Sequence, residues 1–170
     1  MKILKPRVYK KIYRMLDEVS PVFFDCGEIC GEACCHMADN DYGIFLLPGE
    51  ERIQNPDHWL SFEWVDATEC VYPAFEDGKL AFVRCAGPSN CDRKNRPIQC
   101  RTFPYLPVIK NDGSLVLSFN EMELDYCCPL AEQRVRPNKN FIKRTLEAWR
   151  ILIRDTRIRD ALYKGRSSMR

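Results

Sequence analysis

The 170-residue sequence contains no run of about 20 apolar residues, so we expect no transmembrane helix. Residues 1–8 have neither the apolar core nor the small-residue cleavage site of a signal peptide, so we expect none. The chain also has no internal repeat, no low-complexity segment and no glycine-rich phosphate-binding loop. These absences favour a cytoplasmic protein without a membrane interaction and exclude solenoid and P-loop classes.

Histidine is scarce, since the sequence contains only two, His36 and His58. Neither stands in a Ser–His–Asp arrangement, and neither is marked by the sequence as the base for a cysteine nucleophile. His36 follows a pair of cysteines, so a metal-ligand role is one interpretation, but an exposed loop histidine is the favoured one. The sequence therefore leaves open whether the protein is an enzyme.

Cysteine, by contrast, is abundant, with ten residues in the chain. In the reducing cytoplasm structural disulfides rarely persist, so thiolate ligation of a metal is the leading explanation. Four of the cysteines fall in the run at 26–35, with the spacing Cx3C, then x3, then CC. Gly27 and Gly31 follow the first two and permit positive φ, which lets one loop present several sulfurs to a common point.

The vicinal pair Cys34–Cys35 bears on the identity of the metal. Adjacent side chains tend to point apart, which is awkward for one tetrahedral zinc ion and easier for a polynuclear cluster. The alternative is that these cysteines are buried small hydrophobic residues. Four within ten residues makes that alternative the less favoured one.

A second cysteine group lies at Cys85, Cys91 and Cys100. Arg96 and Arg101 flank Cys100, and positive charge there would lower thiol pKa values and offset the charge of several thiolates. Ordinary surface ion pairing is the equally weighted alternative for the two arginines. Three cysteines lie outside both groups: Cys70, which we expect in the core, and the vicinal pair Cys127–Cys128.

Hydrophobic periodicity predicts a helix near each end of the chain, over residues 6–19 and 138–164. Between them we expect a short helix starting near Glu50, another from Pro129 to Gln133, and strands at 44–47, 59–65, 70–72 and 80–83 with a hairpin over 108–117. We therefore expect one small α+β domain over residues 1–170 with short antiparallel strands. Its parts are an N-terminal helix (1–23), a core with irregular cysteine-rich metal-binding loops (24–130) and a basic C-terminal helix (131–170).

Charge is unevenly distributed although the formal total is only +2. Residues 134–170 carry twelve Lys and Arg against three acids, whereas residues 1–133 have a balance of −7. The favoured interpretation is a solvated basic face on a helix that packs against the core. Contact with nucleic acid or an acidic partner is the less favoured alternative, because no aromatic residues interleave with the cations for base stacking.

Three features coincide: the cysteine run at 26–35, the block Arg96-Pro97-x2-Cys100-Arg101-x-Phe103-Pro104, and Cys128-Pro129. Together they resemble the YkgJ-type cysteine-cluster family, described as a zinc- or iron-chelating domain with a CxxCxxxCC signature. The resemblance covers roughly residues 24–130. The first spacing departs from that signature and is nearer to the flagellin lysine N-methylases, a longer domain in which a cysteine-bound [4Fe–4S] centre is implied for methyl transfer.

The resemblance implies eight metal ligands, with Cys127 adding to or replacing the last: Cys26, Cys30, Cys34, Cys35, Cys85, Cys91, Cys100 and Cys128. Eight thiolates exceed the needs of one four-ligand centre, so there are two centres or some structural thiols. We expect an iron–sulfur cluster in preference to zinc, in a redox or metal-handling protein with an unidentified protein partner. The alternatives are a metal-dependent enzyme related to the lysine N-methylases and a structural zinc protein that binds a partner through its basic C-terminal helix.

Overall fold

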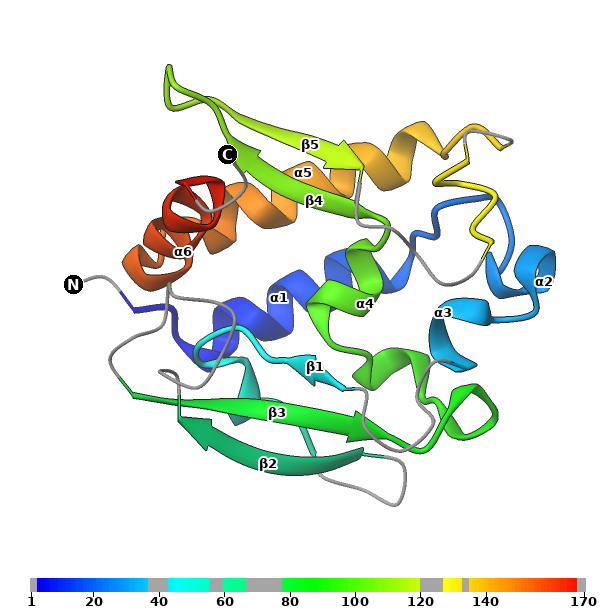
Figure 1. Ribbon diagram of the computed structural model, residues 1–170, viewed down its shortest axis with the longest axis horizontal. Helices are drawn as coiled ribbons and strands as arrows, with labels where there is room; N and C mark the ends of the chain where they lie inside the picture. The colour runs from blue at the N-terminus through cyan, green and yellow to red at the C-terminus, as the bar shows by residue number, and fades with distance from the viewer. Residues whose placement is uncertain are drawn as a thin grey trace.

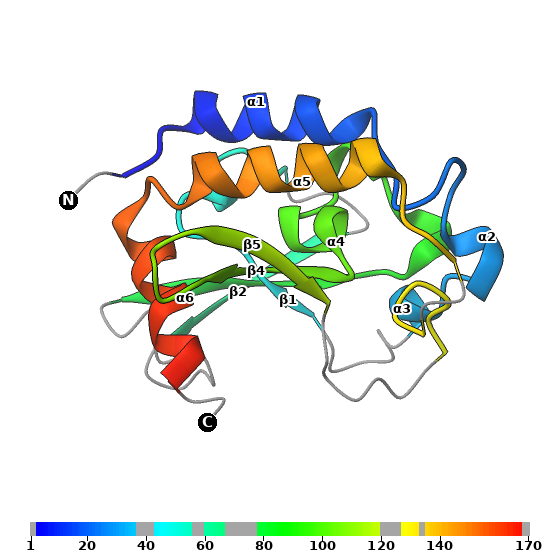
Figure 2. The same cartoon turned by 90° about the horizontal axis from the view of Figure 1, so that it is seen from above.

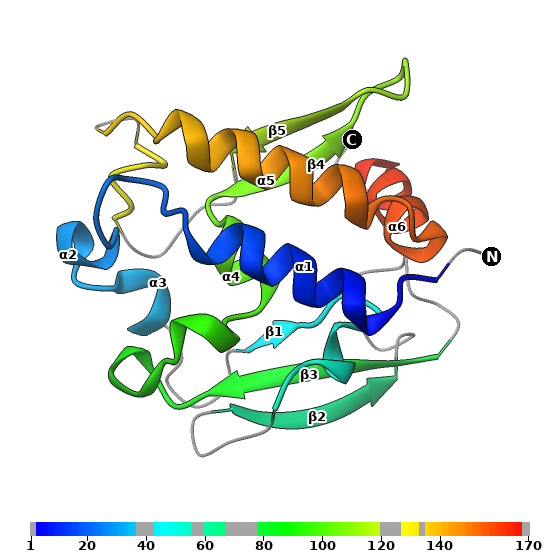
Figure 3. The same cartoon turned by 180° about the vertical axis from the view of Figure 1, so that it is seen from behind.

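The computed structural model describes residues 3–36, 43–55, 60–66, 78–119, 127–132 and 135–167. They form a mixed α+β domain with a helix near each terminus, which confirms the predicted fold class (Figure 1). Helices α1 (Pro6–Asp17) and α5 (Lys139–Leu152) form one layer, and the strands lie to one side of it (Figure 2). Seen from behind, the two helices lie side by side and run in opposite directions (Figure 3).

Helix α1 confirms the N-terminal helix predicted from periodicity. Pro6 occupies the first turn, where its missing N–H and fixed φ are compatible with a helix. The residues that repeat on one face are buried: Tyr9, Ile12, Tyr13 and Leu16. The helix ends at Asp17, two residues earlier than predicted, and the chain then passes through Pro21 toward the cysteine run.

The single C-terminal helix predicted over residues 138–164 is wrong. The chain forms two helices, α5 and α6 (Thr156–Ser167), separated at residues 153–155. Asp155 causes the break, because its Oδ1 accepts a hydrogen bond of 3.1 Å from the Arg157 N–H and so caps the start of α6. Asn138 caps α5 in the same way, by accepting from the Asn140 N–H.

Asp155 also joins three parts of the chain in the interior. Its carboxylate is fully buried and accepts from the Leu4 N–H at 3.0 Å and from Arg157 Nη2 at 2.8 Å. Arg157 Nη2 also donates to the Pro48 carbonyl at 3.0 Å. Burial acts to raise the pKa of Asp155, but the hydrogen bonds from Arg157 and Leu4 outweigh it and hold the pKa below its ordinary value.

We expect Asp155→Asn to lower the free energy of unfolding by about 2 kcal/mol, since it removes the charge that pairs with Arg157 in the interior. Because the folded-state pKa lies below the unfolded value of about 3.9, this stabilisation is present above that pH and is lost as the pH falls through the folded-state pKa. Urea unfolding at neutral and acidic pH measures both effects. Asp160→Asn, in the exposed pair with Arg159, is the control and should cost less than about 0.5 kcal/mol.

The strands form two antiparallel sheets in the described part of the chain. The first has the order β1-β3-β2 and the second is a hairpin of β4 and β5. The bounds are β1 Ile44–Phe45, β2 Leu60–Asp66, β3 Lys79–Cys85, β4 Tyr105–Ile109 and β5 Leu115–Phe119. The predicted hairpin is confirmed, and Gly113 supplies the positive φ of 80° that its turn requires.

Other sequence-based expectations are met only in part. The strand predicted at 44–47 covers only β1, and the helix predicted near Glu50 is a single 3-10 turn, Glu50–Arg52. The helix predicted from Pro129 is wrong over the described residues 127–132, which form a turn; Gln133 lies outside the described residues. The predicted strand at 70–72, Cys70 and His58 also lie outside them.

The main hydrophobic core lies beneath the α1/α5 layer. Ile12 from α1 and Phe141 and Leu152 from α5 are fully buried there. Helix α4 (Ile98–Thr102) inserts Ile98, also fully buried, into this core. Since α4 is anchored by Ile98, Cys100 two residues later faces a different space, which is described below. Within the described residues, no helix combines the length and apolarity needed to cross a bilayer.

Candidate metal centre

A cavity of about 350 Å³ brings together six of the eight predicted ligand cysteines. They come from three segments, the first of which is far in sequence from the other two, and they are Cys26, Cys34, Cys35, Cys85, Cys91 and Cys100. Apolar side chains complete much of the wall, among them Leu16, Val83 and Phe103. Cysteines separated by as many as 74 positions therefore share one largely apolar space.

The first segment folds into two short helices, α2 (Gly27–Cys30) and α3 (Ala33–His36). Gly31 ends α2 with a left-handed φ of 61°, as predicted, and Glu32 has a φ of 59°. Gly27 differs from the prediction, because it lies inside α2 with an ordinary helical conformation. The turn at 31–32 directs the chain into α3 and so brings the vicinal pair to the cavity.

The sulfurs of Cys34 and Cys35 lie on the same side of the chain, with their Sγ atoms 3.9 Å apart. This differs from the expectation that adjacent side chains point apart. Both residues belong to the single turn of α3, and both line the cavity. The pair can therefore offer two sulfurs to the same space.

The second and third segments carry the remaining three cavity cysteines. Cys85 ends β3, and Cys91 lies between two 3-10 turns, η4 (Pro88–Asn90) and η5 (Arg93–Asn95). Asp92 fixes η5, because its carboxylate accepts from the Lys94 N–H at 3.0 Å and from Asn95 Nδ2 at 2.8 Å. Cys100 lies in α4, so strand, turn and helix each place one thiol.

Two arginines bring positive charge directly to this site. Arg96 Nε donates a hydrogen bond of 3.0 Å to Cys91 Sγ. Arg93 Nη1 forms an ion pair of 3.2 Å with Asp25, next to Cys26, and its Nη2 donates to the Val19 carbonyl. The cysteine run and the 91–96 loop are thus joined across the cavity by Arg93, which sequence reasoning did not single out.

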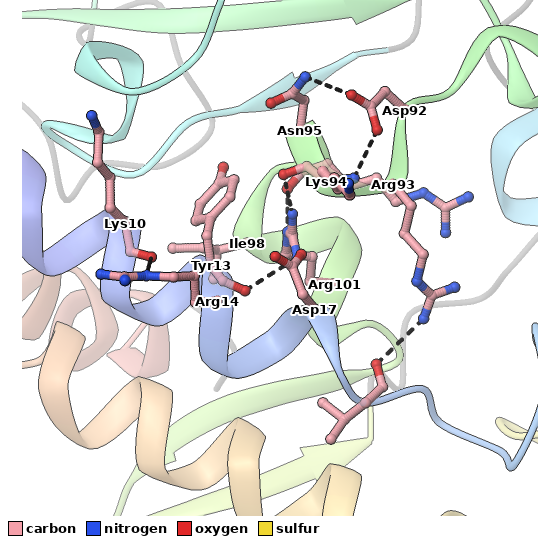
Figure 4. Close-up of polar contacts among 12 residues, drawn as sticks. Lys10, Tyr13, Arg14, Asp17, Asp92, Arg93, Lys94, Asn95, Ile98 and Arg101 are labelled. Carbon is pink, nitrogen blue, oxygen red and sulfur yellow. Dashed lines mark hydrogen bonds and ion pairs between the residues drawn. The ribbon is translucent and has the colours of Figure 1, made fainter.

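Arg101 lines the cavity, and its guanidinium donates hydrogen bonds to Asp17 of α1 and to backbone carbonyls of the 94–96 segment (Figure 4). Its side chain is only 3% exposed, and its Nη1 contacts Asp17 Oδ1 of α1 at 2.5 Å. Its other nitrogens donate to the carbonyls of Arg96 (2.6 Å) and Lys94 (2.5 Å). The guanidinium also stacks 4.3 Å over the Tyr13 ring. Arg101 therefore fixes the 94–101 loop to α1.

Glu50 fixes the start of α4 through a hydrogen bond from the Ile98 N–H. This fully buried carboxylate accepts from the Tyr13 hydroxyl at 2.5 Å and from the N–H groups of Ile98 and Leu47 at 2.8 and 3.0 Å. Burial raises the pKa of Glu50, and the three hydrogen bonds oppose that rise. The sequence predicted only that Glu50 lies near the start of a helix. It did not predict these hydrogen bonds, because their partners Tyr13 and Ile98 are 37 and 48 positions away.

The protein environment favours neutral thiols at this site. Cys100 is an exposed residue that lines the cavity, and desolvation there raises the pKa of its thiol to about 12. Hydrogen bonding with Cys35, and then burial, raise the pKa of the Cys34 thiol. Burial also raises the pKa of Cys91, although Arg96 acts against it. Thiolate ligation here would require the charge of a metal ion, and binding would release protons.

The largest electrostatic influences of other thiols on Cys34 and on Cys100 define two groups of four that share Cys35. Cys34 interacts with Cys26, Cys30 and Cys35, whereas Cys100 interacts with Cys35, Cys85 and Cys91. All four members of the second group line the cavity, but Cys30 of the first does not. Within the described ranges, no group of three or more His, Cys, Asp or Glu side chains is yet arranged to hold a metal ion.

Two predicted ligands lie away from the cavity. Cys30 faces its own helical turn, with its Sγ 3.8 Å from the Cys26 carbonyl. Cys128 is buried in a small cluster with Val22 and Leu130, against which Cys26 packs. Cys127 is exposed, and no disulfide joins any two of the nine cysteines in the described ranges.

Comparisons with protein-family models, with curated proteins and with solved structures found no match to this chain. The assignment of a function therefore depends on the residues themselves.

Proposed function

We propose that this protein binds metal through the thiolates that line the cavity, as an iron–sulfur cluster in preference to zinc. The observation that carries the proposal is the convergence of six cysteines, from three segments, on one space of about 350 Å³. Cysteines that served only as small apolar residues would be distributed through the core. Among the nine described cysteines, only Cys128 is buried in the protein interior.

We assign the primary ligands to Cys35, Cys85, Cys91 and Cys100, the electrostatic group whose members all line the cavity. Four thiolates are the ligand number of a [2Fe–2S] or [4Fe–4S] cluster. Cys26 and Cys34 line the same cavity and are additional donors. Coordination requires the sulfurs to approach a common centre from α3, from the end of β3, from the link between η4 and η5, and from α4.

The chemistry of the surroundings fits such a group. Arg96 donates to the Cys91 sulfur and so offsets part of the negative charge of several thiolates, and Arg93 lies at the cavity wall in its ion pair with Asp25. Apolar wall residues, such as Leu16 and Val83, limit the access of water. When bound, an iron–sulfur cluster supplies one-electron transfer, so the proposed role is redox or metal handling in the cytoplasm with a protein partner.

Zinc is the second candidate, because soft thiolates also bind it. The first group of four is Cys26, Cys30, Cys34 and Cys35, and the spacing of Cys26 and Cys30 is within the range of a structural zinc pair. The first group includes Cys30, whose sulfur lies at its own helical turn away from the cavity, whereas all four members of the second group line the cavity. For this reason we favour one cluster on the second group.

The deciding experiment is the metal and acid-labile sulfide content of anaerobically purified protein. We expect about four iron and four sulfide per chain, with broad visible absorption that bleaches on reduction. If the protein contains zinc and no sulfide, the cavity holds a structural zinc site and not an iron–sulfur cluster. The absence of stoichiometric metal after reconstitution with iron and sulfide, and separately with zinc, would contradict the proposal as a whole.

A further inference from the structure

The outer surface of the helical layer carries two rows of cations. Their spacing places each row on one face of its helix: Arg7, Lys11 and Arg14 on α1, and Lys139, Lys143 and Arg150 on α5. All six are exposed, opposite the buried residues of the same helices. Because α1 and α5 lie side by side (Figure 3), these six residues form one surface, which we call the basic face.

The positive charge of the basic face is not neutralised by neighbouring acids. None of its six residues forms an ion pair with another described residue. The acids of these two helices are mostly engaged elsewhere, since Asp17 pairs with Arg101 and Glu147 with Arg144. The remaining exposed acid next to these helices is Glu18, which directly follows α1. The face therefore presents strong positive potential to solvent.

The basic face has no exposed large hydrophobic residue. None of the exposed large hydrophobic residues in the described part of the chain belongs to α1 or α5, and they are Ile3, Phe23, Phe24, Ile29, Trp64, Leu106 and Tyr163. A membrane-surface helix needs apolar side chains that enter the interface, and a single-strand platform needs aromatic rings for base stacking. The basic face offers neither, so its chemistry suits a ligand that is recognised by charge alone.

We propose that the basic face binds double-stranded nucleic acid through its phosphates, without reading the sequence. Packed helices lie about 8–10 Å apart, and the major groove of a duplex is about 12 Å wide, so two parallel rows of cations match two rows of phosphates. Helix α5 spans about 20 Å, which allows contacts along several phosphates of each strand.

The test compares two matched double charge reversals in the whole protein. Lys11→Glu/Lys143→Glu changes one residue in each row, and Lys79→Glu/Lys110→Glu makes the same charge change at exposed positions in β3 and in the hairpin turn. Binding of a fluorescent DNA duplex is measured by anisotropy between about 50 and about 200 mM salt. For the unmodified protein we expect a slope of log K against log salt near −5, from six phosphate contacts.

We expect Lys11→Glu/Lys143→Glu to weaken duplex binding by more than about tenfold and to flatten the salt slope by about two. The Lys79→Glu/Lys110→Glu protein should stay within about twofold of the unmodified protein. Lys11→Gln/Lys143→Gln, which only removes charge, should weaken binding by an intermediate factor, and circular dichroism checks folding. The proposal is overturned by equal weakening in both reversals, by no duplex binding at low salt, or by binding to phosphatidylserine vesicles alone.

Metal content is measured in parallel, and because no cavity residue is changed, it is expected to stay the same in every variant.

Discussion

Replacing Cys35 with serine is expected to reduce bound metal to less than about a tenth of that in the unmodified protein. Cys35 is among the strongest electrostatic neighbours of both Cys34 and Cys100, so its loss leaves neither group with four sulfurs. Serine keeps the size of the side chain, but its hydroxyl is a poor ligand for a soft metal centre. Because metal binding at such a site contributes directly to folding free energy, the melting temperature should fall as well.

Metal and sulfide analysis of anaerobic protein measures this effect, with Cys127→Ser as the matched control. Cys127 is exposed and does not line the cavity, so its replacement should leave the metal content unchanged. Full metal content in Cys35→Ser would show that the cavity cysteines are not the ligands.

A comparison of Cys85→Ser with Cys34→Ser then separates the two groups. If the primary centre lies on the second group, Cys85→Ser should lose metal and Cys34→Ser should keep most of it. The reverse result would move the centre to the cysteine run and would favour zinc.

Elements whose signals are local could be predicted from the sequence. The face of Ile12 and Leu16 on α1 and the turn at Gly113 depend on periodicity and on turn residues that are close together in the chain. The break between α5 and α6 was missed because the apolar pattern continues across it. The signal was present, since Asp155 followed by Thr156 is an ordinary helix start.

The candidate site was predictable as a set of residue types but not as a geometry. The spacing of the cysteines indicated metal ligation, and the structure brings six of them to one cavity, but the ligand assignment stays a prediction. The roles of Arg101 and Glu50 could not be predicted, because they depend on contacts with α1 at separations of 84 and 37 residues. Such contacts follow from the packing of the whole chain rather than from any local pattern.

Arg101→Ala is expected to lower the free energy of unfolding by about 3 kcal/mol. The substitution leaves the carbonyls of Lys94 and Arg96 without their donor and exposes the Tyr13 ring face that the guanidinium covers. Asp17 is part-exposed and can regain water, so its lost pairing adds less. Urea unfolding measures the loss, and Arg159→Ala, in an exposed ion pair, should cost less than about 0.5 kcal/mol.

The same substitution should weaken metal binding about 10–100-fold, because Arg101 holds the loop that carries Arg96 and leads to Cys100. Metal affinity is measured by competition with a chelator at a temperature where both proteins are folded, so that a change in affinity is distinguished from a loss of stability. Arg101→Lys keeps the charge but cannot reach Asp17 and two carbonyls at once, and it should recover only part of both effects. If Arg101→Ala were destabilised yet bound metal with unchanged affinity, Arg101 would support the fold alone, and the position of the 94–101 loop would not control the thiols.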